Sequence, residues 1–113
     1  AQATAPAPWH DGTPVCPIDR ARLRKLAAEQ GLAGYTPAEQ AALLALGEAI
    51  AASGISPANE RVLIILSTTK GNIGLLGSEP RKCDLNHTAG VIGRHLGAAH
   101  RPLVISNACI SGV

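Results

Sequence analysis

The chain of 113 residues has almost no aromatic side chains. Trp9 and Tyr35 are the only ones, and both Phe and Met are absent. Hydrophobic residues nevertheless make up 46% of the sequence, so the core must be built from aliphatic side chains. Such a composition favours helices packed closely on a buried sheet. It also argues against single-stranded nucleic acid as a partner, because there is no aromatic platform on which bases could stack.

Strong charge is missing too. Ten basic and eight acidic residues give a formal charge of +2, which is too small to indicate a nucleic-acid-binding surface. No apolar run approaches the roughly 20 residues needed to span a bilayer, so we expect no membrane span. The first residues lack the charged and apolar regions of a signal peptide.

Cysteines are few. Cys16, Cys83 and Cys109 are odd in number and irregularly spaced, which argues against a disulfide framework or a zinc site. A reducing compartment is the simpler expectation, and we predict a cytoplasmic protein.

Two regions are expected along the chain. Residues 1–17 hold four of the eight prolines and should form an extended lead-in, poorly ordered unless docked. Residues 18–113 should form a single partial domain that ends at the turn around Cys109.

The helices are marked by their ends. Residues 19–30 have helical apolar spacing and stop at Gly31. The sequence "TPAE" predicts Thr36 as the N-cap of a second helix, with Glu39 as the reciprocal capping partner. That helix should bury an apolar side that includes Leu43 and end at Gly54.

Two apolar runs predict strands. "RVLIILST" at 61–68 and "RPLVISNAC" at 101–109 have the length and continuity of strands buried on both faces. A glycine-rich loop and a helix over 85–96, capped by Gly97, separate them. The order helix, helix, strand, helix, strand predicts an α/β fold, with helices packed on a mostly parallel sheet.

Cys109 directly follows the second predicted strand. Reactive groups gather at the carboxyl ends of parallel strands, and the small neighbours of Cys109 suit a sharp bend that would present its thiol. At the start of a following helix, the dipole would lower the pKa of the thiol and favour the nucleophilic thiolate. The alternative is a cysteine that only packs, since cysteine is among the most buried residue types.

A family resemblance bears on that choice. "SNACISG" at 106–112 resembles the active-site segment of the β-ketoacyl synthases, condensing enzymes of the layered thiolase-like fold. "ERVLIILSTTKGNIGLL" at 60–76 is similar to the strand and loop that precede this segment in the family. The resemblance covers roughly residues 36–113. Ile110 departs from it, because many members have a smaller residue there.

The resemblance implies an acyltransferase. Cys109 would accept an acyl group from an acyl carrier protein as a thioester, and the acyl group would then condense with a malonyl unit, as in fatty acid or polyketide synthesis. No cofactor or metal is implied, and the complete enzyme would be a homodimer or heterodimer.

The family completes its site with residues from the second half of the fold, and only four residues follow Cys109. We therefore expect the chain to be the N-terminal half of a longer enzyme, inactive alone. Two alternatives stay open: a thiolase-like enzyme using coenzyme A thioesters, and a non-catalytic partner subunit. Thiolases resemble "N-x-x-C-x-S-G", and Asn107 precedes Cys109 by one residue too few for that pattern.

Other candidate sites are weaker. His87 and His95 are eight residues apart on the predicted helix, and His100 lies in the turn before the last strand. Metal binding would need a third ligand at a workable spacing, and none is evident, so we expect solvated or hydrogen-bonded histidines. "TTKGNIG" at 68–74 has its Lys before the glycines, which is the wrong order for a phosphate-binding Walker loop. We predict a flexible loop there, near the active site or a subunit interface.

Overall fold

The structure is a computed structural model that describes residues 7–8, 12, 14–15 and 17–110. The principal elements follow the predicted order of helix, helix, strand, helix and strand: α1 (Arg20–Glu29), α2 (Pro37–Ser53), β3 (Ile65–Ser67), α3 (Leu85–Leu96) and β4 (Leu103–Ile105). Short elements accompany them: β1 (Ala7–Pro8), β2 (Pro14–Val15) and the 3-10 turns η1 (Ile73–Leu75), η2 (Pro80–Cys83) and η3 (Ala108–Ile110). The chain is thus a small α/β domain.

Most of the predicted lead-in lies outside the described residues. Within it, β1 and β2 form a two-residue antiparallel pair, with Ala7 opposite Val15 and Pro8 opposite Pro14. Among the described helices, none has the length and apolar character needed to cross a bilayer.

The start of α2 and the ends of α2 and α3 lie where the sequence predicts. The Thr36 hydroxyl accepts a hydrogen bond from the Glu39 backbone N–H at 3.3 Å. The Glu39 carboxylate in turn accepts one from the Thr36 N–H at 2.8 Å. These two bonds satisfy N–H groups that have no partner within the helix. Gly54 and Gly97 end α2 and α3 in the left-handed conformation, at φ 69° and φ 62°.

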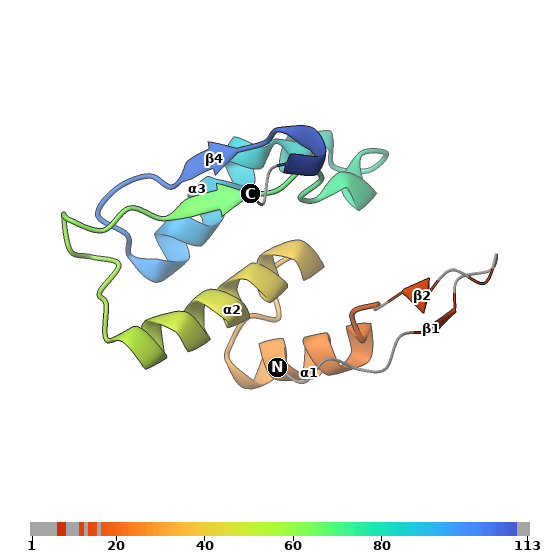
Figure 1. Cartoon of the computed structure of the whole chain (residues 1–113), viewed down its shortest axis with the longest axis horizontal. Coiled ribbons are helices and arrows are strands. Elements are labelled where there is room, and N and C mark those ends of the chain that lie inside the picture. The colour runs from red at the N-terminus through yellow and green to blue at the C-terminus, as the bar shows by residue number, and fades with distance from the viewer. Residues whose placement is uncertain (1–6, 9–11, 13, 16, 111–113) are drawn as a thin grey trace.

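The sheet is parallel, as predicted. β3 and β4 are neighbours in register, with Ile65 opposite Leu103 and Ser67 opposite Ile105. Parallel strands need a long crossover connection, and α3 supplies it. Figure 1 shows α3 against the sheet, with α2 and then α1 lying beyond it. Both strands therefore point their carboxyl ends toward the same edge.

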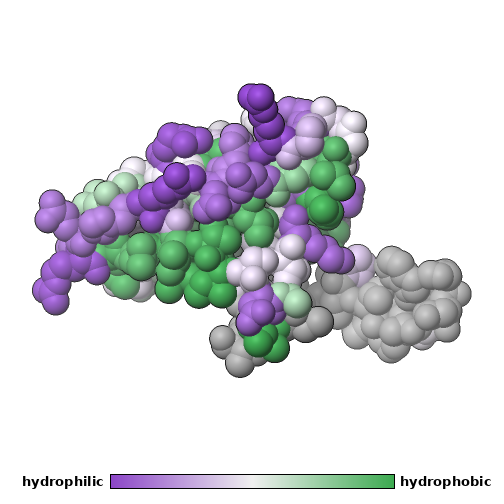
Figure 2. Space-filling model, turned by 90° about the horizontal axis from the view of Figure 1, so that it is seen from above, coloured by the Kyte–Doolittle hydropathy of each residue, from purple (hydrophilic) through white to green (hydrophobic). Residues whose placement is uncertain are grey.

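The prediction that these strands are buried on both faces is wrong. Leu63, Ile65, Leu103 and Ile105 are 53%, 54%, 50% and 41% exposed. One helical layer covers only one face of a two-stranded sheet, so the alternate side chains stay open to solvent. Figure 2, which views the molecule from the β4 side, shows hydrophobic residues gathered in a band. A continuous apolar run predicts a strand, but it does not specify what covers each face.

The core is small and aliphatic. Ala27, Leu32, Leu43 and Ile92 form one buried cluster where α1, α2 and α3 meet. Of the side predicted to be apolar on α2, only Leu43 is fully buried. The core holds the helices against the inner face of the sheet, and Ser67, Ser106 and Asn107 at the carboxyl edge are exposed.

Candidate functional site

The carboxyl ends of the two parallel strands lie side by side. The Thr68 N–H donates to the Ile105 carbonyl oxygen at 3.2 Å, directly beyond the paired residues Ser67 and Ile105. This bond places the start of the glycine-rich loop beside the segment that leads to Cys109. The strand edge on which sequence reasoning placed the site is therefore built from both predicted strands.

A tight turn follows β4. After Ser106 and Asn107 the chain enters η3, where the Ile110 N–H donates to the Asn107 carbonyl oxygen at 3.1 Å. Ala108 has φ 46°, and it is the only non-glycine residue with positive φ in the described part of the chain. The left-handed region costs an alanine about 1–2 kcal/mol. Backbone strain of this kind often accompanies functional sites, because the surrounding structure must hold it.

Cys109 lies at the middle of this turn. The backbone of η3 is described, whereas the side chain of Cys109 lies outside the described part of the structure. Its neighbours Ala108 and Ile110 are exposed. The turn thus has the sharp bend after a parallel strand that the sequence predicts, and the role of the thiol stays a prediction.

A buried polar cluster supports the loop after β3. The Asn72 side chain is 5% exposed and accepts a hydrogen bond from the Thr36 hydroxyl at 2.6 Å. Its amide nitrogen lies within 3.0–3.4 Å of the Lys82 carbonyl oxygen, the Glu39 carboxylate and the Thr88 hydroxyl. The cluster ties the start of α2 and the first turn of α3 to the glycine-rich loop. The flexible loop expected there is therefore anchored at Asn72.

Sequence reasoning missed this cluster, although one signal was present. Asn72 lies in "TTKGNIG", and Gly71 before it adopts φ 48°. A side chain in place of Gly71 would bring its Cβ to 2.7 Å from Leu85 Cδ2. Glycine therefore allows a close approach to α3 that directs Asn72 inward.

Of the other two cysteines, Cys83 lies within the described residues. The Cys83 thiol is half-buried and donates to the Asn72 carbonyl oxygen at 3.2 Å. Cys83 is thus part of the packing around the polar cluster. Cys16 lies outside the described residues.

Of the described histidines, His87 is half-buried in the first turn of α3, whereas His95 and His100 lie away from the carboxyl edge. His95 Nδ1 is 2.8 Å from the Tyr35 hydroxyl, and the rings meet edge to face. His100 Nε2 donates to the Glu60 carbonyl oxygen at 2.7 Å. His95 and His100 come at the end of α3 and before β4, so both are at the opposite end of β4 from Cys109. Within the described ranges, no three His, Cys, Asp or Glu residues are grouped to hold a metal ion.

Comparison with family models, curated proteins and solved structures finds no match to this chain. The resemblance to condensing enzymes therefore rests on the residues of the sequence itself.

Proposed function

We propose that this chain is the acyl-accepting part of a β-ketoacyl synthase-like condensing enzyme of the thiolase-like fold, with Cys109 as nucleophile. The observation that carries the proposal is the turn after β4. It follows a parallel strand, and Ala108 enters it at φ 46°. Ligands in parallel α/β folds bind at this edge, and a bent backbone there supports the presentation of a nucleophile.

The first step is acyl transfer. The Cys109 thiolate attacks the carbonyl carbon of an acyl thioester, and a new carbon–sulfur bond forms. The bond to the carrier sulfur breaks, and the carrier leaves as a thiol after taking up a proton. The Cys109 backbone N–H would help to stabilise the oxyanion that develops on the carbonyl oxygen.

The second step is condensation. A malonyl thioester loses carbon dioxide, and the electron pair of the broken bond forms an enolate. The enolate carbon attacks the acyl carbonyl on Cys109, a carbon–carbon bond forms, and the thiolate is released. Decarboxylation needs hydrogen-bond donors for the enolate. His95 and His100 are engaged at the far end of β4, so these donors would come from other residues of the protein or from a partner subunit.

The polar cluster around Asn72 supports the same edge. Thr68 lies beside the end of β4, and its hydroxyl accepts a hydrogen bond from the Gly71 N–H at 3.3 Å. Asn72 then fixes the loop to α2 and α3. A loop fixed in this way would form one wall of the acyl site.

The test is acylation of the complete protein, read by intact mass and peptide mapping. We expect an acyl carrier thioester to add one acyl group at Cys109, and Cys109→Ser to remove the adduct. Cys83→Ser is the matched control, and it should keep the adduct because Cys83 packs against the Asn72 carbonyl.

The other results separate the alternatives. Acylation from coenzyme A thioesters alone would favour a thiolase-like enzyme. A protein that stays unmodified with both donors would favour a non-catalytic partner subunit, and it would overturn the proposal.

A further inference from the structure

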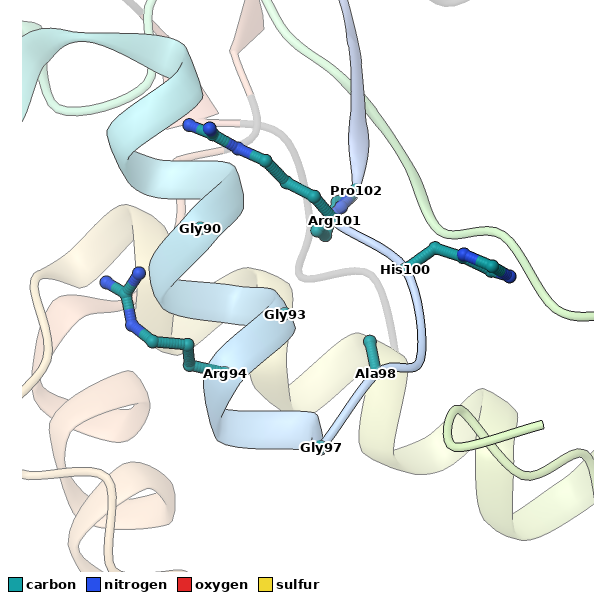
Figure 3. A pocket seen from close by; sticks show the side chains of 8 residues that line it. All are labelled: Gly90, Gly93, Arg94, Gly97, Ala98, His100, Arg101 and Pro102. Atoms are coloured by element: carbon teal, nitrogen blue, oxygen red, sulfur yellow. The ribbon is translucent and has the colours of Figure 1, made fainter. Parts of the chain in front are cut away.

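A second candidate site lies at the opposite end of β4 from Cys109. It is a cavity of about 390 Å³ between the C-terminal half of α3 and the loop that leads into β4. Gly90 and Gly93 lie on the helix side, and Pro102 lies on the loop side. Figure 3 shows Arg94 leaving the helix and Arg101 leaving the loop, with both side chains running back along α3. The pocket is thus independent of the proposed acyl site.

Glycines shape this pocket. A Cβ on Gly93 would lie 2.6 Å from Pro102 Cδ, so only glycine allows the loop to pack this closely on α3. A Cβ on Gly90 would lie 3.2 Å from Arg94 Nη1, so the Arg94 guanidinium lies close over bare helix backbone.

Both arginine side chains contact α3 itself. Arg94 lies over Gly90, and Arg101 Nη2 donates to the Asn86 carbonyl oxygen at 3.3 Å. Asn86 and Gly90 are four residues apart, which is about one turn and ~6 Å along the helix axis. The two guanidinium groups therefore lie over successive turns of one helix face.

Neither charge is neutralised within the described part of the chain. The ion pair found there joins Lys82 to Glu79, in η2 and just before it, and neither arginine has an acidic partner. Both arginines are exposed. The nearby end of α3 carries the partial negative charge of the helix dipole, so any attraction for an anion must come from the two guanidinium groups.

We propose that this pocket binds a phosphate group, either free or carried by a small organic molecule. Each guanidinium presents several N–H donors in a planar fork that matches phosphate oxygens. Two such groups one turn apart can share one tetrahedral dianion, which also removes the repulsion between their charges. A single carboxylate carries half that charge and would satisfy only one fork. The volume is at the small end of the range for ligand pockets, which fits a small phosphorylated molecule.

The test is a titration of the full chain with inorganic phosphate at low ionic strength, followed by NMR. We expect the amide signals of Gly90 and Gly93 to shift in a saturable way. Arg94→Gln and Arg101→Gln should each weaken phosphate binding by about tenfold, and the double variant should abolish it. Arg22→Gln is the matched control, because it removes the same charge from an exposed position on α1.

Three further measurements complete the test: binding of glycerol 3-phosphate, binding of a short single-stranded RNA, and thermal unfolding. Glycerol 3-phosphate binding more tightly than inorganic phosphate would identify a phosphorylated molecule as the ligand, and equal or weaker binding would identify free phosphate. A chain that gives no saturable shift, or an Arg22→Gln variant that loses as much affinity as Arg94→Gln, would overturn the proposal. So would stronger binding to a short single-stranded RNA than to either small phosphate. The Arg94 guanidinium makes no hydrogen bond to the described residues, so we expect Arg94→Gln to unfold at the same temperature as the unmodified chain. That result would exclude loss of fold as the cause of weaker phosphate binding.

Discussion

At the scale of single residues, the Asn72 carboxamide connects segments that are far apart in the sequence. Its oxygen accepts a hydrogen bond from the Thr36 hydroxyl. Its nitrogen donates hydrogen bonds to the buried Glu39 carboxylate and to the Thr88 hydroxyl. All the polar partners of Asn72 are buried or half-buried. If one of these hydrogen bonds is lost, water therefore cannot easily take the place of the missing partner. The cluster thus links the beginnings of α2 and α3.

Removing this side chain should be costly. We expect Asn72→Ala to lower the free energy of unfolding by about 2–3 kcal/mol, because Glu39 and Thr88 keep their burial and lose a donor. Urea denaturation followed by circular dichroism measures this loss. Asn86→Ala is the control: the Asn86 side chain is exposed and makes no hydrogen bond to the described residues, so its change should stay within about 0.5 kcal/mol. An Asn72→Ala chain as stable as the control would show that the cluster does not hold the loop.

At the scale of elements, local signals in the sequence were reliable. Thr36 and Glu39 cap the start of α2, and Gly54 and Gly97 end α2 and α3, as predicted, because a cap depends on residues within a few positions. The predicted strands run over 61–68 and 101–109, whereas β3 and β4 pair over three residues each. Strand length depends on a partner strand and a covering layer, which a local pattern does not contain.

The same distinction applies to the two candidate sites. The bend at Cys109 was predictable from its position after an apolar run and from its small neighbours. The Asn72 cluster and the Arg94–Arg101 pair were not, because each joins residues that only the folded chain brings together. For Arg94 and Arg101, the deciding contacts are with the backbone and glycines of α3, which periodicity does not reveal.

Two glycines inside helices allow a test of packing between elements. Gly93 of α3 faces Pro102, and an added Cβ would clash at 2.6 Å. We expect Gly93→Ala to destabilise the chain by about 1–3 kcal/mol, since the rigid proline ring and its loop must move. Gly47 of α2 has no atom within 4 Å of an added Cβ, so Gly47→Ala should stabilise by about 0.5–1 kcal/mol through helix propensity. Thermal unfolding measures both, and changes of the same sign would contradict this account.

At the scale of the whole molecule, one face of the sheet has no covering layer in the described structure. Leu63, Ile65, Leu103 and Ile105 are about half exposed, and all come from β3, β4 or the residue stretch just before β3. Parallel sheets in proteins are normally covered on both faces. Contiguous apolar surface of this kind promotes association, since burying it removes hydrocarbon from water.

We therefore expect the chain to self-associate in solution through this face, and Leu103→Lys to weaken the association about tenfold or more. Burying a leucine side chain contributes about 1.5–3 kcal/mol when complete, and a lysine there would also place a charge in the contact. Leu103 is 50% exposed, so burying its exposed half would contribute about half of that free energy. Because 1.4 kcal/mol corresponds to a tenfold change in affinity, this contribution accounts for much of the expected weakening. Sedimentation velocity over a range of concentrations measures this association.

Leu76→Lys is the matched control, because Leu76 is 58% exposed but lies after η1, outside the sheet. If the two variants dissociate alike, or if the unmodified chain stays monomeric at every concentration, the apolar face is not the surface through which copies meet.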